Sequence, residues 1–374
     1  MARYHVAVAK CDDYSRLGQA FEELKEKARL SSFAEKLRGK KVLVKPNILG
    51  KYRPEQAATT HPELVRQVVR WLRSAGAQVS VGDNCGVGGY GINERAAKIS
   101  GVMDASEGAY VNVARDVVEK EIDSRFFKKL ILSRAMLEAD YIVNLPKLKT
   151  HTLSLLTLGI KNMFGMLAGA SKGKVHNSAQ RLEEFGEALS DIFRIRPPEL
   201  TLIDGVIGMD GNGPNVGRVR PIGCLLAGEN APAVDLVVAK MAGADAKRMH
   251  HLRITGERGL GPVDLKDVEI AGVHKPIPRF KLPSTLAQHG FLGFIVNRYV
   301  YRSIISSKLV LNQEKCNQDR VCLKACPSGA MSWKNDRPEI DHQKCIRCMC
   351  CHELCAEGAW EIAGLLRRFT GNKP

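Results

Sequence analysis

Cys345-Ile346-Arg347-Cys348-Met349-Cys350-Cys351-His352-Glu353-Leu354-Cys355 contains cysteines at a C-x2-C-x2-C-x3-C spacing. The same pattern occurs 29 positions earlier as Cys316, Asp319, Cys322 and Cys326, with an aspartate at the second position and Pro327 after the last. Cysteines at this spacing hold iron–sulfur clusters, whereas zinc ribbons use C-x2-C pairs separated by a longer insert. The repeat therefore predicts a small C-terminal domain with two iron–sulfur clusters.

This region, roughly residues 311 to 364, resembles the bacterial-type two-cluster ferredoxins. In that family the fourth cysteine of each run binds the cluster of the other run. The resemblance implies one [4Fe-4S] cluster, and its ligands would be Cys345, Cys348, Cys351 and Cys326. The second cluster would take Cys316, Cys322 and Cys355, with Asp319 as the candidate fourth ligand.

Asp319 departs from the pattern of that family. A carboxylate oxygen is a harder ligand than a thiolate and suits iron–sulfur chemistry less well. The second cluster is therefore expected to be either [4Fe-4S] with an oxygen ligand or [3Fe-4S] without that iron. Alternatively, Asp319 is only a solvated loop residue. Cys350 is not expected to bind a cluster, because the positions of the repeat already supply four ligands.

The distribution of cysteines along the chain indicates the cellular compartment. Cys11, Cys85 and Cys224 are scattered among apolar residues and are expected to be small buried hydrophobic side chains. An odd total of 11 cysteines, concentrated in cluster motifs, argues against a disulfide framework and predicts a cytoplasmic protein. MARYHVAVAK is expected to be an opening strand, and no apolar run reaches the length of a membrane span. Nothing in the sequence indicates the oligomeric state.

The chain is strongly basic, with 56 Lys and Arg against 40 Asp and Glu and a net charge of +16. The basic residues are dispersed, no nucleic-acid-binding motif is recognisable, and only 6% of the residues are aromatic. Nucleic-acid binding is therefore not expected, although a basic nucleic-acid binder with structural clusters is a third interpretation. A positive field can equally attract an acidic redox partner or a small anionic substrate.

The first 275 residues alternate strand and helix patterns. Strands are expected at 41–44, 78–81, 140–145 and 200–203, and an amphipathic helix is expected from Pro62 to the stop at Gly76. This order predicts an α/β domain with a mainly parallel sheet over 1–275. A linker and helix over 276–310 follow, and then a small α+β ferredoxin-type domain over 311–364. The helix, at 286–305, is expected to pack between the domains rather than on a membrane surface.

Cationic side chains gather after the strand 140–145. Lys147, Lys149 and His151 follow it directly, and Lys161 comes after a short apolar stretch. At the carboxyl end of a strand such a group suits a carboxylate or phosphate ligand, although a solvated basic loop is an alternative. The Gly86-x-Gly88-x2-Gly91 run formally matches a phosphate-binding turn but lacks the acidic residue of a dinucleotide site.

A second resemblance covers about the first 245 residues. The segments that carry it are KPNI (45–48), TTHPELV (59–65), GDN (82–84), NLPKLKTH (144–151), GIKNMFG (159–165), IDG (203–205), GNGP (211–214) and AVDLVVAKMAG (233–243). They resemble the prokaryotic family called domain of unknown function 362, whose members often carry a C-terminal two-cluster ferredoxin domain. The resemblance implies this architecture and redox biology, but no substrate.

Together these features favour an iron–sulfur protein, with oxidoreductase activity as one expectation. The clusters would transfer electrons to or from a site in the α/β domain that binds a small anion. The alternative is an iron–sulfur or metallocofactor assembly or carrier protein, in which the Asp319 corner lends iron or accepts a thiolate.

Overall fold

The structure is a computed structural model, and it describes residues 4–85, 92–168, 171–179, 181–283, 308–326, 328–345, 351–352, 355 and 357–363. Several predictions made from the sequence lie outside these ranges. They concern the glycine turn at 86–91, the helix at 286–305, Cys348 and Cys350. Within the described ranges, every helix falls short of the length and apolar character that a membrane crossing requires.

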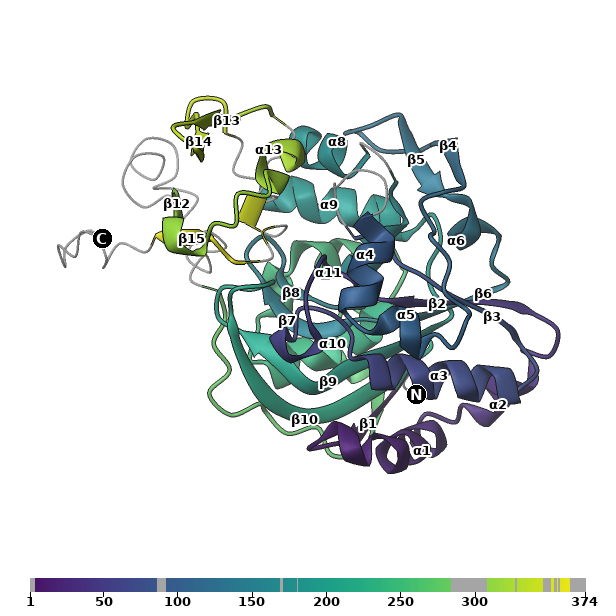
Figure 1. The fold of residues 1–374 in the computed structure, drawn as a ribbon. Coiled ribbons are helices and arrows are strands. Elements are labelled where there is room, and N and C mark those ends of the chain that lie inside the picture. Colours follow the sequence, from purple (N-terminus) through teal and green to yellow (C-terminus); the bar gives the residue numbers. More distant parts are fainter. Residues whose placement is uncertain are drawn as a thin grey trace.

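A nine-stranded sheet forms the centre of the larger domain (Figure 1). Its main path is β11-β1-β10-β9-β6-β2-β3, and β7 and β8 lie beside β9. The strands are β1 (Tyr4–Lys10), β2 (Lys41–Pro46), β3 (Gln78–Val81), β6 (Tyr141–Leu145), β7 (Lys147–His151), β8 (Leu155–Thr157), β9 (Leu200–Asp210), β10 (Arg218–Gly228) and β11 (Val268–Ala271). Pairs β2–β3, β2–β6, β6–β9, β7–β9 and β1–β11 are parallel. The predicted α/β domain with a mainly parallel sheet is confirmed.

Helices cover both faces of this sheet. The strand β2 explains why, because Val42 and Val44 belong to one buried apolar cluster and Leu43 to the other. Successive strand residues point to opposite faces, so an apolar strand needs cover on both sides. One face carries α1 (Leu17–Lys27), α2 (Ser31–Glu35), α3 (Pro62–Ser74), α4 (Ile92–Ile99) and α5 (Val102–Ala105). The other carries α6 (Arg134–Glu138), α7 (Gly159–Asn162), α8 (Ser171–Ser178), α9 (Leu182–Phe193), α10 (Ala231–Met241) and α11 (His250–Glu257).

The expected strands and helix form where the sequence patterns place them. Helix α3 begins at Pro62, and the Nδ1 atom of His61 caps it by accepting the backbone N–H of Glu63 at 3.2 Å. It ends before Gly76, whose φ of +80° suits glycine. Strand β9 is longer than expected and runs to Asp210. A separate hairpin, β4 (Val117–Glu121) and β5 (Lys129–Ser133), lies outside the main sheet.

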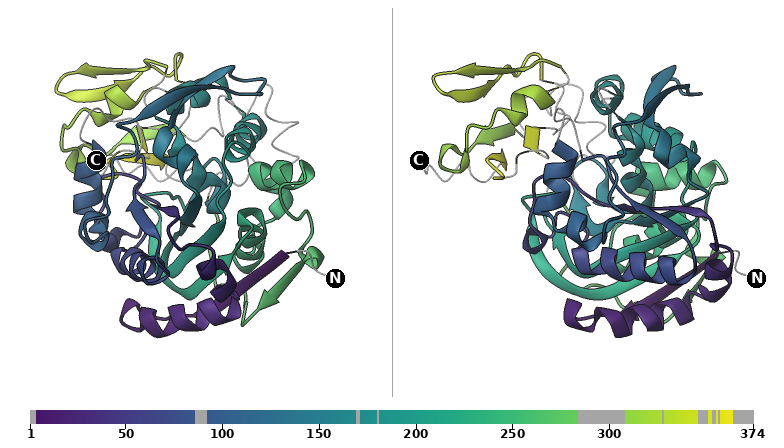
Figure 2. Two further views of the ribbon diagram at one scale, coloured as in Figure 1. Left: turned by 90° about the vertical axis from the view of Figure 1, so that its right-hand side faces the viewer. Right: turned by 45° about the vertical axis from the view of Figure 1, so that its right-hand side comes forward.

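The smaller domain stands to one side of the larger one (Figure 2). Strands β12 (Lys308–Leu311) and β15 (Trp360–Ala363) pair antiparallel, and so do β13 (Met331–Lys334) and β14 (Arg337–Ile340). The short helix α13 (Val321–Ala325) carries Cys322. The expected small C-terminal α+β domain is present, whereas the exact boundaries 1–275, 276–310 and 311–364 stay predictions.

Candidate functional site

A cleft opens in the described part of the chain at the carboxyl ends of β2 and β3, where open α/β sheets commonly bind ligands. It encloses about 680 Å³ of empty space, part of which is open to solvent. The loops after β2 and β3, the β7–β8 hairpin, α7 and α8 all contribute to its walls. The lining residues are Asn47, Ile48, Leu49, Asp83, Asn84, Cys85, Lys149, His151, Thr157, Lys161, Asn162, Phe164, Gly165, Lys172, His176 and Pro214.

The floor of the cleft is an ion pair between β2 and the loop that follows the neighbouring strand β3. Lys45 is fully buried, and its Nζ atom lies 2.7 Å from Oδ1 of Asp83. Burial lowers the pKa of Lys45, and the charge of Asp83 opposes that shift. The other Asp83 oxygen accepts the backbone N–H of Ile48 at 2.8 Å. A Cβ at Gly165 would lie 2.1 Å from the Asp83 carboxylate, so glycine is needed at this position.

Aromatic rings hold the cationic side chains of α7 and α8. The Nζ atom of Lys161 lies 4.7 Å from the ring centroid of Phe164 and 5.5 Å from that of Phe185. His176 stacks on Phe185 at 4.9 Å. Lys172 donates to the backbone carbonyl of Asn84 and lies 6.0 Å from the Phe164 centroid. Cation–π contacts of this kind stabilise buried ammonium groups without neutralising them.

The surroundings of Lys172 shift its acid–base behaviour toward neutral pH. Burial lowers its pKa to about 8, partly opposed by the charges of Asp83 and Cys85 and reinforced by those of Lys45 and Lys161. An amine with this pKa can both hold and release a proton near neutral pH.

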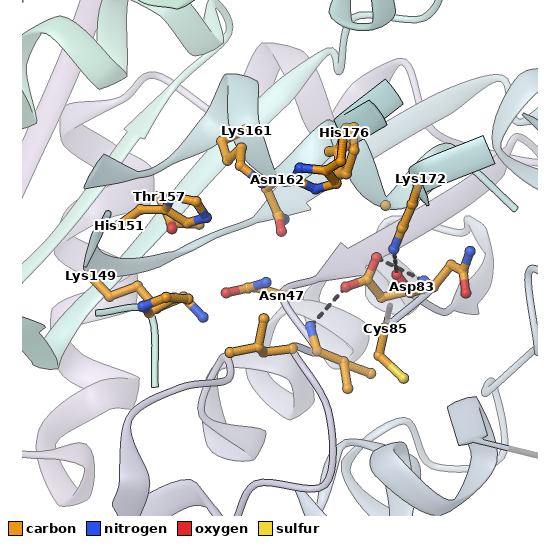
Figure 3. Close-up of a pocket in the computed structure, with 16 residues that line it drawn as sticks. Asn47, Asp83, Cys85, Lys149, His151, Thr157, Lys161, Asn162, Lys172 and His176 are labelled. Atoms are coloured by element: carbon orange, nitrogen blue, oxygen red, sulfur yellow. Dashed lines mark hydrogen bonds between the residues drawn. The ribbon is translucent and has the colours of Figure 1, made fainter. Parts of the chain in front are cut away.

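The β7–β8 hairpin carries the opposite end of the cleft. Lys149 and Thr157 face each other across the hairpin, and the Lys149 ammonium donates to the backbone carbonyl of Ala58. Figure 3 shows Asn47 between two groups of side chains, with Lys149, His151 and Thr157 at one end and Lys172, Asp83 and Cys85 at the other. The cleft is therefore elongated, with amine groups at both ends.

Of the four residues proposed from the sequence as an anion site, Lys149, His151 and Lys161 line this cleft and Lys147 does not. The Lys147 ammonium instead lies 2.9 Å from Asp204 and 2.7 Å from the Tyr14 hydroxyl. The register of β7 on β9 shifts between Lys147, which pairs with Asp204, and Lys149, which pairs with Met209. The segment 147–151 is also a buried strand, not a solvated loop.

Several other lining residues are not among the site residues that the sequence predicts. Asn47 directly follows the carboxyl end of β2, which is a signal that could have identified it. Thr157 and Lys172 stand in segments without a comparable signal. Within the described ranges, Oδ1 of Asn47 and Oγ1 of Thr157 are buried and have no hydrogen-bond partner. Buried polar atoms of this kind need a partner, which a ligand in the cleft could supply.

A buried carboxylate positions the segment that carries Lys161 and Asn162. Asp235 on α10 accepts the backbone N–H groups of Gly159 and Ile160 at 2.7 and 2.9 Å. Burial raises its pKa to about 7, and these two hydrogen bonds act in the opposite direction. The side chain thus fixes the first turn of α7 to α10.

We expect Asp235→Ala to lower the free energy of unfolding by about 2–4 kcal/mol, because it leaves two buried N–H groups unsatisfied and opens a small cavity. Chemical denaturation of the intact protein measures this change. As a matched control, Asp267→Ala removes a carboxylate from a position outside the buried core and should change stability by about 0.5 kcal/mol or less. Equal effects of the two substitutions would contradict the role of Asp235.

The smaller domain keeps the symmetry of the cysteine repeat. The sulfur atoms of Cys326 and Cys355 accept the backbone N–H groups of Ala330 and Ala359 at 3.2 and 3.3 Å. These residues are related by the 29-position repeat. N–H groups directed at cysteine sulfur are a feature of iron–sulfur sites, where they tune the reduction potential. The donor chemistry therefore fits iron–sulfur clusters.

Three of the predicted cysteine ligands, Cys322, Cys351 and Cys355, pack in one apolar group with Trp360. Burial is the main cause that raises the pKa of the Cys322 thiol to about 11, and the charges of Cys355 and Asp319 add to it.

In the described part of the chain, no three acidic, histidine or cysteine side chains converge on one metal-sized site. Cluster ligands each bind a different iron and stand farther apart than the ligands of a single ion.

Two loops of the larger domain hold the second cysteine run. The Tyr52 hydroxyl donates to the carbonyl of Cys355 at 2.8 Å. The side-chain amide of Asn215 donates to the carbonyls of His352 and Cys355 at 2.7 and 3.2 Å and to the Tyr52 hydroxyl at 2.8 Å. A Cβ at Gly358 would lie 2.6 Å from a methyl group of Val216, so the two surfaces are in close contact.

Comparisons with protein families agree with this division of the chain. Residues 42–240 match the model described as domain of unknown function (DUF362), and residues 308–356 match a 4Fe-4S dicluster domain. A relative is the thylakoid-associated protein sll1697 of Synechocystis sp. (strain ATCC 27184 / PCC 6803 / Kazusa). It is 31% identical over 226 residues, which is 60% of this chain and 70% of that protein.

Among solved structures, similarity is weak. The lactate racemase apoprotein from Thermoanaerobacterium thermosaccharolyticum has a TM-score of 0.41 and 12% identity, and the match covers 64% of this chain and 57% of that one. A crystal structure of a protein from Thermotoga maritima has a TM-score of 0.39 and 12% identity, covering 66% and 60%. The chain thus spans less than two thirds of either solved structure.

Proposed function

Because the chain belongs to the family described as domain of unknown function (DUF362) and is an iron–sulfur protein with a 4Fe-4S dicluster domain, we propose that it is an oxidoreductase acting on a small anion bound in the cleft. Two clusters would be held as the ferredoxin resemblance implies. One would use Cys345, Cys348, Cys351 and Cys326, and the other Cys316, Cys322 and Cys355. Bound clusters supply or accept single electrons. The chain itself binds the anion and provides acid–base groups.

One observation carries this proposal: the same two loops line the cleft and hold the smaller domain. The loop after β2 places Leu49 on the cleft wall and Tyr52 against the Cys355 carbonyl. The loop between β9 and β10 places Pro214 on the wall and Asn215 against the same carbonyl. A ligand in the cleft would therefore lie beside the backbone of a predicted cluster ligand.

The charge of the cleft supports an anionic ligand. Its described lining contains the lysines Lys149, Lys161 and Lys172 but a single carboxylate, Asp83. That carboxylate is already paired with Lys45 beneath the cleft. Buried ammonium groups attract carboxylate or phosphate oxygens strongly, because the surroundings screen charge less than water does. A substrate with one or two carboxylate or phosphate groups fits this environment.

Binding of an anion is expected to weaken as the pH rises through about 8. Lys172 is charged below its lowered pKa and neutral above it, so the attraction is present at lower pH and lost at higher pH. Sulfate is a suitable probe, because its charge is constant in this range. Calorimetric titration should show about a tenfold loss of sulfate affinity between pH 7 and 9, typical of losing a charge-assisted hydrogen bond. Lys172→Met should bind sulfate weakly and with almost no dependence on pH. If its affinity changed with pH as that of the wild-type protein does, the role of Lys172 would be contradicted.

The function is tested with the complete, anaerobically prepared protein. Its clusters are reduced with dithionite, excess reductant is removed, and a panel of small carboxylates and phosphates is added while the visible absorbance is followed. At least one anion should accelerate reoxidation, and iron and sulfide should remain bound over repeated cycles. An assembly or carrier protein would instead lose iron to an acceptor protein that lacks its cluster. That outcome would contradict the electron-transfer function and support the function in cofactor assembly or transport.

The partner and the compartment are parts of the same proposal. An acidic redox protein is the expected electron donor or acceptor, because the chain carries a net charge of +16. The cysteine usage favours the cytoplasm. The name of the Synechocystis relative associates that protein with thylakoids, so cell fractionation should also test whether this chain is found with membranes.

A further inference from the structure

Asp319 occupies the cysteine position in the first run, yet both of its carboxylate oxygens have other partners. Oδ1 accepts the backbone N–H of Val321 at 3.0 Å. Oδ2 lies 3.6 Å from the ammonium of Lys51, a residue of the larger domain. The two side chains are 28% and 22% exposed, so the ion pair lies at the edge of the domain contact.

The backbone around Asp319 favours these contacts. Gln318 and Arg320, on either side of it, have positive φ values of 59° and 56°. The side chain of Asn317 accepts the Asp319 backbone N–H at 3.2 Å. A turn fixed in this way directs the carboxylate toward the start of α13, where it caps Val321.

Lys51 is placed at this turn by its neighbour. Tyr52 is 1% exposed and donates its hydroxyl to the carbonyl of Cys355, the residue that the ferredoxin resemblance assigns to the same cluster as Cys316 and Cys322. The loop that carries Lys51 is therefore anchored against that cluster site. The Lys51 ammonium contacts Asp319, which stands where the repeat would otherwise place a fourth cysteine.

We propose that Lys51 holds Asp319 away from iron, so that the cluster bound by Cys316, Cys322 and Cys355 has one iron without a protein ligand. An iron held only by cluster sulfides and an exchangeable oxygen donor such as water is the one most easily lost. Ferricyanide would accept one electron from such a cluster, this iron would leave as Fe²⁺ and [3Fe-4S] would remain; added Fe²⁺ with one electron from dithionite would restore [4Fe-4S]. The ion pair is partly exposed and therefore weak, so removing Lys51 should change the form of the cluster only modestly. The larger domain thus controls the form of the cluster.

The test uses the full-length protein and electron paramagnetic resonance, together with iron analysis, after one equivalent of ferricyanide. The wild-type protein should show a [3Fe-4S] signal, and Asp319→Asn should show the same signal because Asp319 is not a ligand. Lys51→Met, which keeps the aliphatic stem, should reduce the [3Fe-4S] fraction about threefold by releasing the carboxylate to iron, within the small range of an exposed ion pair. Asp319→Cys should abolish the signal by supplying a thiolate.

Two controls make the result decisive. Lys10→Met removes another exposed lysine, paired with Asp12 at 2.8 Å within the larger domain, and should leave the signal unchanged. The double variant Lys51→Met with Asp319→Asn should return to the wild-type signal. The proposal is overturned if the wild-type protein shows no [3Fe-4S] signal, if Asp319→Asn alone changes the signal, or if Lys51→Met leaves it unchanged. None of these readouts requires the anionic substrate, so they stand apart from the test of the cleft.

Discussion

Replacing Cys355 by serine is expected to lower the iron content of the anaerobically prepared protein from about six to eight atoms per chain to about four. The thiolate of Cys355 is the predicted crossing ligand of the cluster that also uses Cys316 and Cys322. A serine oxygen is a harder and weaker ligand for iron–sulfur chemistry. That cluster should therefore be lost, while the cluster assigned to the other run remains.

The design of this variant follows from the contacts of Cys355. Its carbonyl, not its sulfur, receives the hydrogen bonds of Tyr52 and Asn215, so the contact between the domains should persist. Parallel iron and acid-labile sulfide analysis gives the measurement. Cys224→Ala serves as control, because that thiol is buried in the larger domain and should leave iron unchanged. A protein that contained a single zinc and no labile sulfide would contradict the whole assignment of clusters.

The α/β domain could be predicted from the sequence because its elements follow local rules. Strand β3 occupies 78–81 as expected, and α3 extends from Pro62 to the residues before Gly76. Short apolar runs that alternate with amphipathic helices leave few architectures other than a sheet covered on both faces. The cysteine repeat was equally informative, because ligand spacing depends on cluster chemistry rather than on the rest of the fold.

The cleft was only partly predictable, because its geometry depends on long-range pairing. Lys147 and Lys149 are two residues apart, and the sequence places both in one anion site. In the structure Lys147 is opposite Asp204 on β9 and forms an ion pair with it, and the register shifts before Lys149. Lys172 comes from α8, far along the chain, and nothing in its local sequence indicates that it reaches Asn84. The Lys51–Asp319 ion pair joins two domains and had no sequence signal at all.

The separation of Lys147 from the cleft also affects which substitution should alter ligand binding. Removing the Lys147 charge would leave Asp204 buried and unpaired, which typically costs about 3–5 kcal/mol of stability. Anion affinity should change little in the fraction that remains folded. Lys161 is placed differently, because it lines the cleft and its ammonium lies over the rings of Phe164 and Phe185.

We therefore expect Lys161→Met to weaken sulfate binding by about 1–3 kcal/mol, roughly 5- to 150-fold, with iron content unchanged. Methionine keeps an unbranched apolar side chain against Phe164 and Phe185, so the loss reports the charge. Lys174→Met, from the exposed face of α8, removes the same charge outside the cleft and controls for long-range attraction. Calorimetric titration at low and physiological salt compares the three proteins.

If Lys174→Met and Lys161→Met weaken sulfate binding equally, and both effects vanish at physiological salt, binding reflects only the general positive field of the chain. A selective loss in Lys161→Met that persists in salt would locate the anion in the cleft, since partly buried charges are screened much less than exposed ones.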